Sequence, residues 1–231
     1  MKIINALKKK ISGRMSSEEY SAYLRGKGAT IGKTTVFIDP KQTHVDEQAA
    51  FLIFIGDYCT ITAGVTILAH DYSFSVLNNT YGIMPQNHRQ TKIGNNVFVG
   101  RGATILMGAE IGDNCIIGAG AVVSGKVPDN TVWAGNPAKQ ISTLDAFKEK
   151  RAKYYEDGAI TLAKGIITRL GRKPTYEEMG AYIGLFAPRT EEFRKYFEAL
   201  SKRYETVADN VWNMEKKYID LDDFLEKNHL I

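Results

Sequence analysis

Residues 93–128 read IGNNVF, VGRGAT, ILMGAE, IGDNCI, IGAGAV and VSGKVP, six consecutive hexads that each begin with isoleucine or valine. The same spacing of six residues occurs earlier at Ile55, Ile61 and Ile67. An interval of six matches neither the period of about 3.6 residues of an amphipathic helix nor the alternation of a free strand. The spacing therefore predicts a solenoid of stacked repeats.

The fifth residue of each hexad is small or moderately small, and glycine often follows the leading aliphatic residue. The fifth places are Val97, Ala103, Ala109, Cys115, Ala121 and Val127. The large residue suits the interior and the small one a tight corner, so each hexad predicts a short strand and a turn. A single unit cannot bury its apolar face, and stacked coils pool one core. The expected fold class is mainly β.

The predicted solenoid covers residues 29–143 and is interrupted once for a long stretch. The spacing of six is absent from residues 41–52, which indicates an irregular first coil. Ile67 and Ile93 are separated by an interval that is not a multiple of six, so residues 71–90 form an excursion loop. Long loops held by a rigid scaffold often carry binding residues.

Helical segments are expected on both sides of the solenoid. Residues 1–28 form an N-terminal helical segment, in which Ser16 and Glu19 have the spacing of a capping box. Residues 144–231 form a C-terminal α-helical module, with helix starts after Thr175 and Thr190. Its aromatic residues suit a small core, or a surface that packs on a partner subunit.

The formal net charge of +4 suits an anionic small ligand better than a nucleic acid, which requires a dense basic stripe. Cys59 and Cys115 occupy fifth places and are expected to be packing residues. Without a bilayer-spanning stretch or a signal peptide, a cytoplasmic location is expected. Ile3, Ile4, Leu7 and Ile11 would line one face of a short basic helix, which suits docking on the protein itself or contact with an anionic membrane.

The order of the motifs is also that of a known family. The hexads, ILAHDYS at 67–73 and VPDNTVWAGNPAK at 127–139 resemble the hexapeptide-repeat acyltransferases over about residues 25–143. The likeness is greatest to the branch of maltose/galactoside acetyltransferases and surface-polysaccharide O-acetyltransferases. It implies a left-handed parallel β-helix, a homotrimer and active sites between subunits. With coils of 18 residues, Val97 would stack on Cys115, Ala103 on Ala121 and Ala109 on Val127.

Acyl transfer to a hydroxyl needs a base, because an alcohol is a poor nucleophile near neutral pH. His70 stands where the solenoid breaks into the loop, and the resemblance places the family's catalytic histidine there. Asp71 and Tyr72 are candidates for holding the acceptor, and His88 is a candidate that could face the same cleft or remain solvated. A backbone carbonyl or a residue of another subunit is expected to orient His70, since Asp71 is too close in sequence.

The resemblance also implies acetyl-CoA as cosubstrate and assigns residues to it. Arg101 and Ala119 match positions along the pantetheine arm, and Ser124 and Lys126 lie near a hydroxyl and a lysine position of the family. The lysine is displaced by one residue. Phe98 and Ala121 stand at positions where the family often has tryptophan and serine. Pro137 and Lys139 match positions at the adenine and a phosphate.

The expected function is acetyl-CoA-dependent O-acetylation of a sugar hydroxyl. The expected acceptor is a sugar of a surface polysaccharide or of its precursor. An N-acetyltransferase acting on an amino-sugar nucleotide and a non-catalytic trimeric scaffold remain as alternatives. No metal is expected, because a zinc hydratase on this scaffold needs three histidines. Only His70 and His88 are near the middle of the solenoid.

Overall fold

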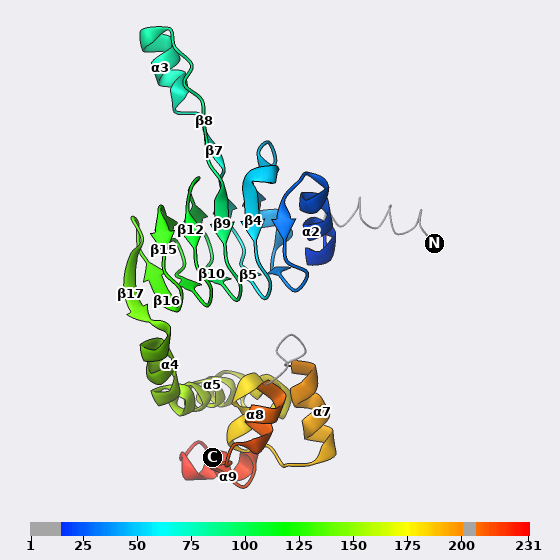
Figure 1. Ribbon diagram of the computed structural model, residues 1–231. Helices are drawn as coiled ribbons and strands as arrows, with labels where there is room; N and C mark the ends of the chain where they lie inside the picture. The colour runs from blue at the N-terminus through cyan, green and yellow to red at the C-terminus, as the bar shows by residue number, and fades with distance from the viewer. Residues whose placement is uncertain (1–14, 201–206) are drawn as a thin grey trace. The chain divides into compact units, whose positions relative to one another are not determined.

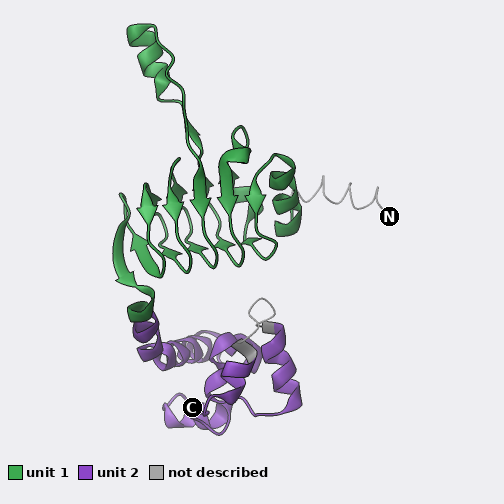
Figure 2. Ribbon diagram, viewed as in Figure 1, with its two compact units in different colours: residues 1–147 green, residues 148–231 purple. Residues whose placement is uncertain are grey.

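The chain forms two compact units, residues 1–147 and residues 148–231 (Figure 2). The computed structural model describes residues 15–200 and 207–231. The basic helix expected around Ile3 to Ile11 lies outside the described residues. Within the described part of the chain, no helix has the length and apolar character needed to cross a membrane.

The first unit is a parallel β-helix with three sheets, called A, B and C here (Figure 1). Sheet A contains β1 (Thr30–Ile31), β4 (Ile53–Ile55), β9 (Thr91–Ile93), β12 (Glu110–Ile111) and β15 (Lys126–Val127). Sheet B contains β2 (Val36–Phe37), β5 (Thr60–Ile61), β10 (Phe98–Val99), β13 (Ile116–Ile117), β16 (Thr131–Ala134) and β17 (Lys139–Thr143). Sheet C contains β3 (His44–Val45), β6 (Thr66–Ile67), β11 (Thr104–Ile105) and β14 (Val122–Val123). All pairs in these sheets are parallel except β16 with β17.

The aliphatic residues of the hexads form columns inside the coil. In sheet A, Ile55 pairs with Ile93, Ile93 with Ile111, and Ile111 with Val127. All four are buried, as are the corresponding columns of sheets B and C except for Trp133, which is half-buried at the end of the sheet B column. Burial of one aliphatic side chain contributes roughly 1.5–3 kcal/mol, so these columns are the main source of stability. The predicted solenoid core is confirmed.

One predicted stacking pair is wrong. Val97 and Ala103 lie next to Cys115 and Ala121, as the adjoining strand registers require. Val127, however, pairs with Ile111 and not with Ala109. The corner between β14 and β15 is shorter than the corresponding corner before β12, so Val127 takes the interior aliphatic place.

Asparagine recurs at the corner between sheets A and B for a conformational reason. Asn96, Asn114 and Asn130 have positive φ angles of 53°, 56° and 59°. Asparagine adopts this left-handed region more readily than most residues. The Asn96 side-chain amide donates to Asn114 Oδ1 at 2.8 Å, and Asn114 donates to Asn130 Oδ1 at 3.1 Å. The ladder ties three successive coils together at their edge.

Replacing Gly100 with alanine is expected to destabilise the β-helix by about 1–3 kcal/mol, as overpacking typically does. A Cβ at Gly100 would lie 2.5 Å from the Ala119 nitrogen and 2.8 Å from the Ile117 oxygen, both of them backbone atoms. Gly165, in a helix of the second unit with no atom within 4 Å of its Cβ position, is the matched control. Its alanine variant should be neutral or slightly more stable. Calorimetric melting of both variants tests this, and an unchanged transition in the Gly100 variant would contradict it.

Helix α2 (Ser17–Gly26) covers the N-terminal end of the coil. The predicted capping box is present, because Ser16 accepts from the Glu19 amide and Glu19 accepts from the Ser16 amide. Leu24 is buried, and Tyr20 packs edge-on against Phe37 at a centroid distance of 5.0 Å. Short 3-10 helices, η1 (Pro40–Gln42) and η2 (Ala50–Leu52), occupy the irregular first coil.

The excursion after Ile67 is an arm with structure of its own. It contains β7 (His70–Asp71), α3 (Phe74–Tyr81) and β8 (Asn87–His88), and β7 pairs with β8 in antiparallel fashion. Figure 1 shows the two strands leading away from the coil, with α3 at the tip. No residue of α3 is buried. The hairpin base is therefore the part of the arm that stands next to the β-helix.

The second unit is helical and has a separate core. Its elements are α4 (Leu144–Lys153), which begins in the first unit, α5 (Tyr155–Leu170), α6 (Tyr176–Met179), η3 (Gly180–Leu185), α7 (Glu191–Leu200), α8 (Val207–Asn213) and α9 (Leu221–Lys227). At the helix start predicted after Thr175, Thr175 and Glu178 form a capping box. Phe186 and Phe197 are buried in this core, whereas Tyr154 is exposed.

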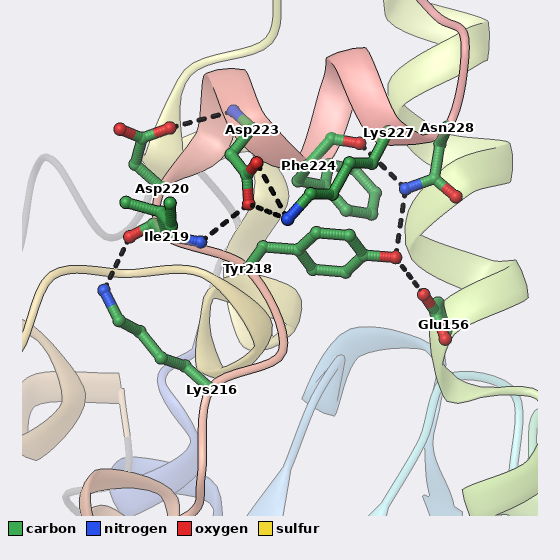
Figure 3. A network of polar contacts seen from close by, with 9 residues as sticks. All are labelled: Glu156, Lys216, Tyr218, Ile219, Asp220, Asp223, Phe224, Lys227 and Asn228. Atoms are coloured by element: carbon green, nitrogen blue, oxygen red, sulfur yellow. Dashed lines mark hydrogen bonds and ion pairs between the residues drawn. The ribbon is translucent and has the colours of Figure 1, made fainter.

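A polar network fastens the C-terminal helix to α5 (Figure 3). The Tyr218 hydroxyl donates to Glu156, and the Asn228 amide donates to the Tyr218 hydroxyl at 3.1 Å. Lys217 forms an ion pair with the same glutamate. Tyr218 is buried and packs edge-on against Phe224, so the network connects polar and apolar contacts.

Candidate functional site

His70 lies at the corner between sheets C and A in the second coil. It follows β6 by three residues and begins β7, at the point where the chain leaves the coil for the arm. Its side chain is 12% exposed. The predicted position at the break in the solenoid is therefore confirmed as a corner where a side chain can meet both the coil and the arm.

Asp46 orients the imidazole, and its carboxylate is hydrogen-bonded through Oδ2 to His70 Nδ1. Asp46 follows β3 in the first coil, and its backbone nitrogen donates to the Ile67 oxygen at 2.9 Å. The same carboxylate accepts from the backbone amides of Ala69 at 3.0 Å and Ala49 at 3.2 Å. The prediction that a backbone carbonyl or a residue of another subunit orients His70 is thus wrong, because the preceding coil supplies the carboxylate of Asp46.

The electrostatics at this pair define which ring nitrogen can act as a base. Burial alone would raise the pKa of Asp46, but hydrogen bonds from Ala69, His70 and Ala49 hold that pKa below its usual value. An ionised carboxylate only accepts hydrogen bonds, so His70 Nδ1 carries the proton in the neutral ring. His70 Nε2 then presents a lone pair. Within the described chain, this nitrogen is buried and has no hydrogen-bond partner.

Tyr72 and His88 both contact the His70 ring. The Tyr72 ring meets it edge-on at a centroid distance of 4.8 Å, and the Tyr72 hydroxyl donates to Gln48 Oε1 at 2.6 Å. The His88 ring stacks on it at 5.6 Å with an angle of 22°. Three of the predicted site residues therefore come together at the base of the arm.

Asp71 forms its hydrogen bonds with Ser73. Its Oδ1 accepts hydrogen bonds from the side chain and the backbone amide of Ser73, just before α3. These bonds, the side-chain one first, hold the pKa of Asp71 below its usual value. Asp71 therefore organises the start of the arm helix.

Three of the residues assigned to the coenzyme follow one corner of the coil. Arg101 and Ala119 occupy the corner between sheets B and C in successive coils, where the Gly120 amide donates to the Arg101 oxygen at 2.8 Å. Pro137 lies in the next turn, since the Ala138 amide donates to the Val122 oxygen at 2.9 Å. Arg101, Ala119 and Pro137 are exposed. This corner and the His70 corner border sheet C on opposite sides.

The other three assigned residues lie elsewhere. Ser124 directly follows β14, at the same corner as His70 but in a later coil. Lys139 begins β17 and pairs with Ala134 of β16. Lys126 lies on sheet A, where its Nζ is 3.6 Å from Glu110 Oε2. The pair is exposed, and such pairs contribute little to stability.

A groove of about 690 Å³ runs along the outer face of sheet A. Lys92, Glu110 and Lys126 are among the residues that line it. His70 and Asp46 are not, so the groove is separate from the oriented histidine. We place the candidate site at His70 because its chemistry, rather than the size of a hollow, distinguishes it.

Asp46 and Gln48 are site residues that the sequence analysis missed. Both belong to the irregular first coil, where no repeat register indicates which residue faces which. The pairs Asp46 with His70 and Gln48 with Tyr72 show that the two segments run side by side. The sequence does contain one signal for Asp46. It directly follows the interior residue Val45, at the corner that lies one coil before that of His70.

Comparison with known proteins supports the hexapeptide repeat. The family described as bacterial transferase hexapeptide (six repeats) matches residues 90–125. Protein CapG of Staphylococcus aureus is 38% identical over 127 residues, which cover 55% of this chain and 73% of that protein.

Two further similarities concern named acetyltransferases. The galactoside O-acetyltransferase of Escherichia coli (strain K12) is 32% identical over 143 residues, covering 56% of this chain and 66% of the relative. A solved structure, galactoside acetyltransferase in complex with coenzyme A, is 26% identical with a TM-score of 0.39. That match covers 53% of this chain and 65% of the solved one. The similarity does not extend over the whole of this chain.

Proposed function

This chain belongs to the hexapeptide-repeat acetyltransferases, and we propose that it transfers the acetyl group of acetyl-CoA to a hydroxyl of a sugar. The proposed general base is His70. The observation that carries the proposal is the Asp46–His70 pair, which holds Nδ1 and leaves His70 Nε2 without a hydrogen-bond partner among the described residues. The proposed acceptor is a sugar of a surface polysaccharide or of its precursor.

The proposed reaction uses this pair directly. His70 Nε2 takes the proton of the acceptor hydroxyl as the oxygen attacks the thioester carbonyl of acetyl-CoA. The ionised Asp46 stabilises the imidazolium that forms, and backbone amides stabilise the tetrahedral oxyanion. When the carbon–sulfur bond breaks, the proton passes from His70 to the departing thiolate. An acetyl ester and free coenzyme A result.

The coenzyme is proposed to lie along the outer side of sheet C. Arg101, Ala119 and Pro137 border this face at one corner, and Ser124 lies at the other. Exposed backbone groups there suit the amides of pantetheine, while Lys139 supplies a cation for a phosphate. Lys126 is retained as a more distant candidate, because Glu110 lies beside it on sheet A.

The assembly and domain organisation are also proposals. We infer a left-handed coil, a homotrimer and active sites between subunits, in which a neighbour completes the acceptor site near Tyr72 and His88. Residues 29–143 are the proposed acyltransferase domain, flanked by a helical segment at 1–28 and a helical module at 144–231. Light scattering tests the trimer against the monomer mass of 25.7 kDa.

The activity is tested by incubating the full chain with acetyl-CoA and a panel of free sugars, nucleotide sugars and oligosaccharides. Thiol release and a product heavier by one acetyl group are expected. Hydroxylamine cleaves an ester and leaves an amide intact, so it separates O-acetylation from N-acetylation. A product that resists hydroxylamine would contradict the proposed sugar O-acetyltransferase.

Exchanging Lys139 for glutamate is expected to raise the KM for acetyl-CoA about tenfold or more, the effect of losing one charge-assisted hydrogen bond. The acceptor KM should change little. Lys164→Glu, an exposed lysine of α5, is the matched charge reversal and should leave both constants unchanged. Steady-state kinetics with acetyl-CoA as the varied substrate measure the effect. An unaltered coenzyme KM would remove Lys139 from the site.

A further inference from the structure

We propose that His88 is a positioning residue, whose ring packs on His70 and holds the imidazole plane so that Nε2 meets the acceptor hydroxyl. The inference rests on the proposed role of His70 as the base. It gives His88 a function toward His70 instead of the contact with the acceptor that the sequence suggests.

The backbone brings the two histidines together. In the antiparallel pair of β7 and β8, His70 is directly opposite His88, and Asp71 is opposite Asn87. Side chains directly opposite each other in such a pair stand on the same face and interact. The stacked contact at 5.6 Å and 22° therefore follows from the hairpin register.

The contacts of His70 come from three segments. Asp46 of the first coil holds Nδ1, Tyr72 meets the ring edge, and His88 covers one face. A hydrogen bond at one nitrogen leaves the ring able to tilt, because the second side-chain torsion of histidine is broad. A flat group on the face restricts that tilt. Asp46 thus selects the tautomer, and His88 restricts the plane.

The geometry argues against a proton relay between the two rings. The hydrogen-bonding groups of an imidazole lie in the plane of its ring, and the two planes are only 22° from parallel. A ring stacked in this way offers its face and not a nitrogen. Since Asp46 is bonded to His70, the positive charge that forms during transfer is stabilised on His70.

The test compares His88→Ala with His88→Phe in the full chain. Misplacement of a reacting group by about 1 Å can lower a rate about 10²-fold, so a fall in kcat of about 10-fold to 10²-fold is expected for alanine. The acceptor KM should remain within about twofold. Phenylalanine supplies a flat ring without a titratable nitrogen and should restore most of kcat. His229→Ala, an exposed histidine of the second unit, is the control.

Three results would overturn the proposal. An increase in acceptor KM at unchanged kcat would show that His88 binds the acceptor. An equal loss of kcat in the alanine and phenylalanine variants would show that the reaction needs the ring nitrogens of His88. Full activity of the alanine variant would show that His88 has no role in the reaction.

A second measurement does not depend on finding the acceptor. The Cε1 proton of His70, identified by its absence from the NMR spectrum of His70→Ala, should lose a ring-current shift in His88→Ala and retain it in His88→Phe. An unchanged resonance in the alanine variant would overturn the stacking. Failure of the wild-type chain to acetylate any sugar would instead count against the proposed function.

Discussion

Replacing His70 with alanine is expected to lower kcat for acetyl transfer by about 10²–10⁴-fold, the range typical of a positioned general base. The acceptor hydroxyl then has to lose its proton to water, which is neither oriented nor held by Asp46. The KM for acetyl-CoA should change little, because the coenzyme is proposed to bind along sheet C. Initial rates of thiol release at saturating substrates measure the effect.

The interpretation of this variant depends on intact folding. His70 lies at a corner of the coil and belongs to none of the interior columns, so circular dichroism and the melting temperature should stay close to those of the wild-type chain. A loss of kcat below about tenfold in a folded variant would exclude His70 as the base. His229→Ala again serves as the matched histidine control.

Exchanging Asp46 for asparagine is expected to lower kcat by about 10²-fold or more, since the comparable change in a serine protease triad costs about 10⁴-fold. Asparagine is nearly the same size but can present an NH₂ group where Asp46 Oδ2 now accepts. It would favour the ring tautomer with the proton on Nε2, which cannot take a proton from the acceptor. The coenzyme KM should be unaffected. Activity within about threefold of wild type would contradict the orienting role.

The same substitution is expected to change how stability depends on pH. The pKa of Asp46 is lowered in the folded chain, so its carboxylate stabilises the fold above the unfolded value of about 3.9. This contribution is lost as the pH falls through the lower folded pKa. Urea unfolding between about pH 5 and pH 3 should therefore show a steeper loss of stability for the wild-type chain than for Asp46→Asn. Equal slopes would indicate that folding does not lower the pKa of Asp46.

The regular part of the fold could be predicted because the same contact recurs. Ile93, Ile111 and their equivalents face the interior in every coil, and small residues such as Ala103 and Ala121 fit the corners. A periodic pattern of this kind needs no knowledge of distant contacts. His70 was predictable for a related reason, since a break in a regular pattern is visible in the sequence.

The irregular parts could not be predicted from periodicity. The arm contains a helix without a buried residue, so α3 has no apolar stripe imposed by a core. The regular spacing of six predicts a corner place for Val127, and the spacing does not indicate that the turn between β14 and β15 is shortened. Asp46 lies in a coil whose register is lost, and its contact with His70 depends on the path of the intervening residues.

The sequence by itself determined the period of six, the stacked β core and the histidine at its interruption, because each depends on local spacing and residue size. Only the tertiary structure decided what holds that histidine. Asp46 reaches His70 from a preceding coil, Tyr72 from the residue that follows β7, and His88 from β8. These contacts depend on the stacking of the coils and on the register of the hairpin. Both bring together residues that the repeat pattern does not connect.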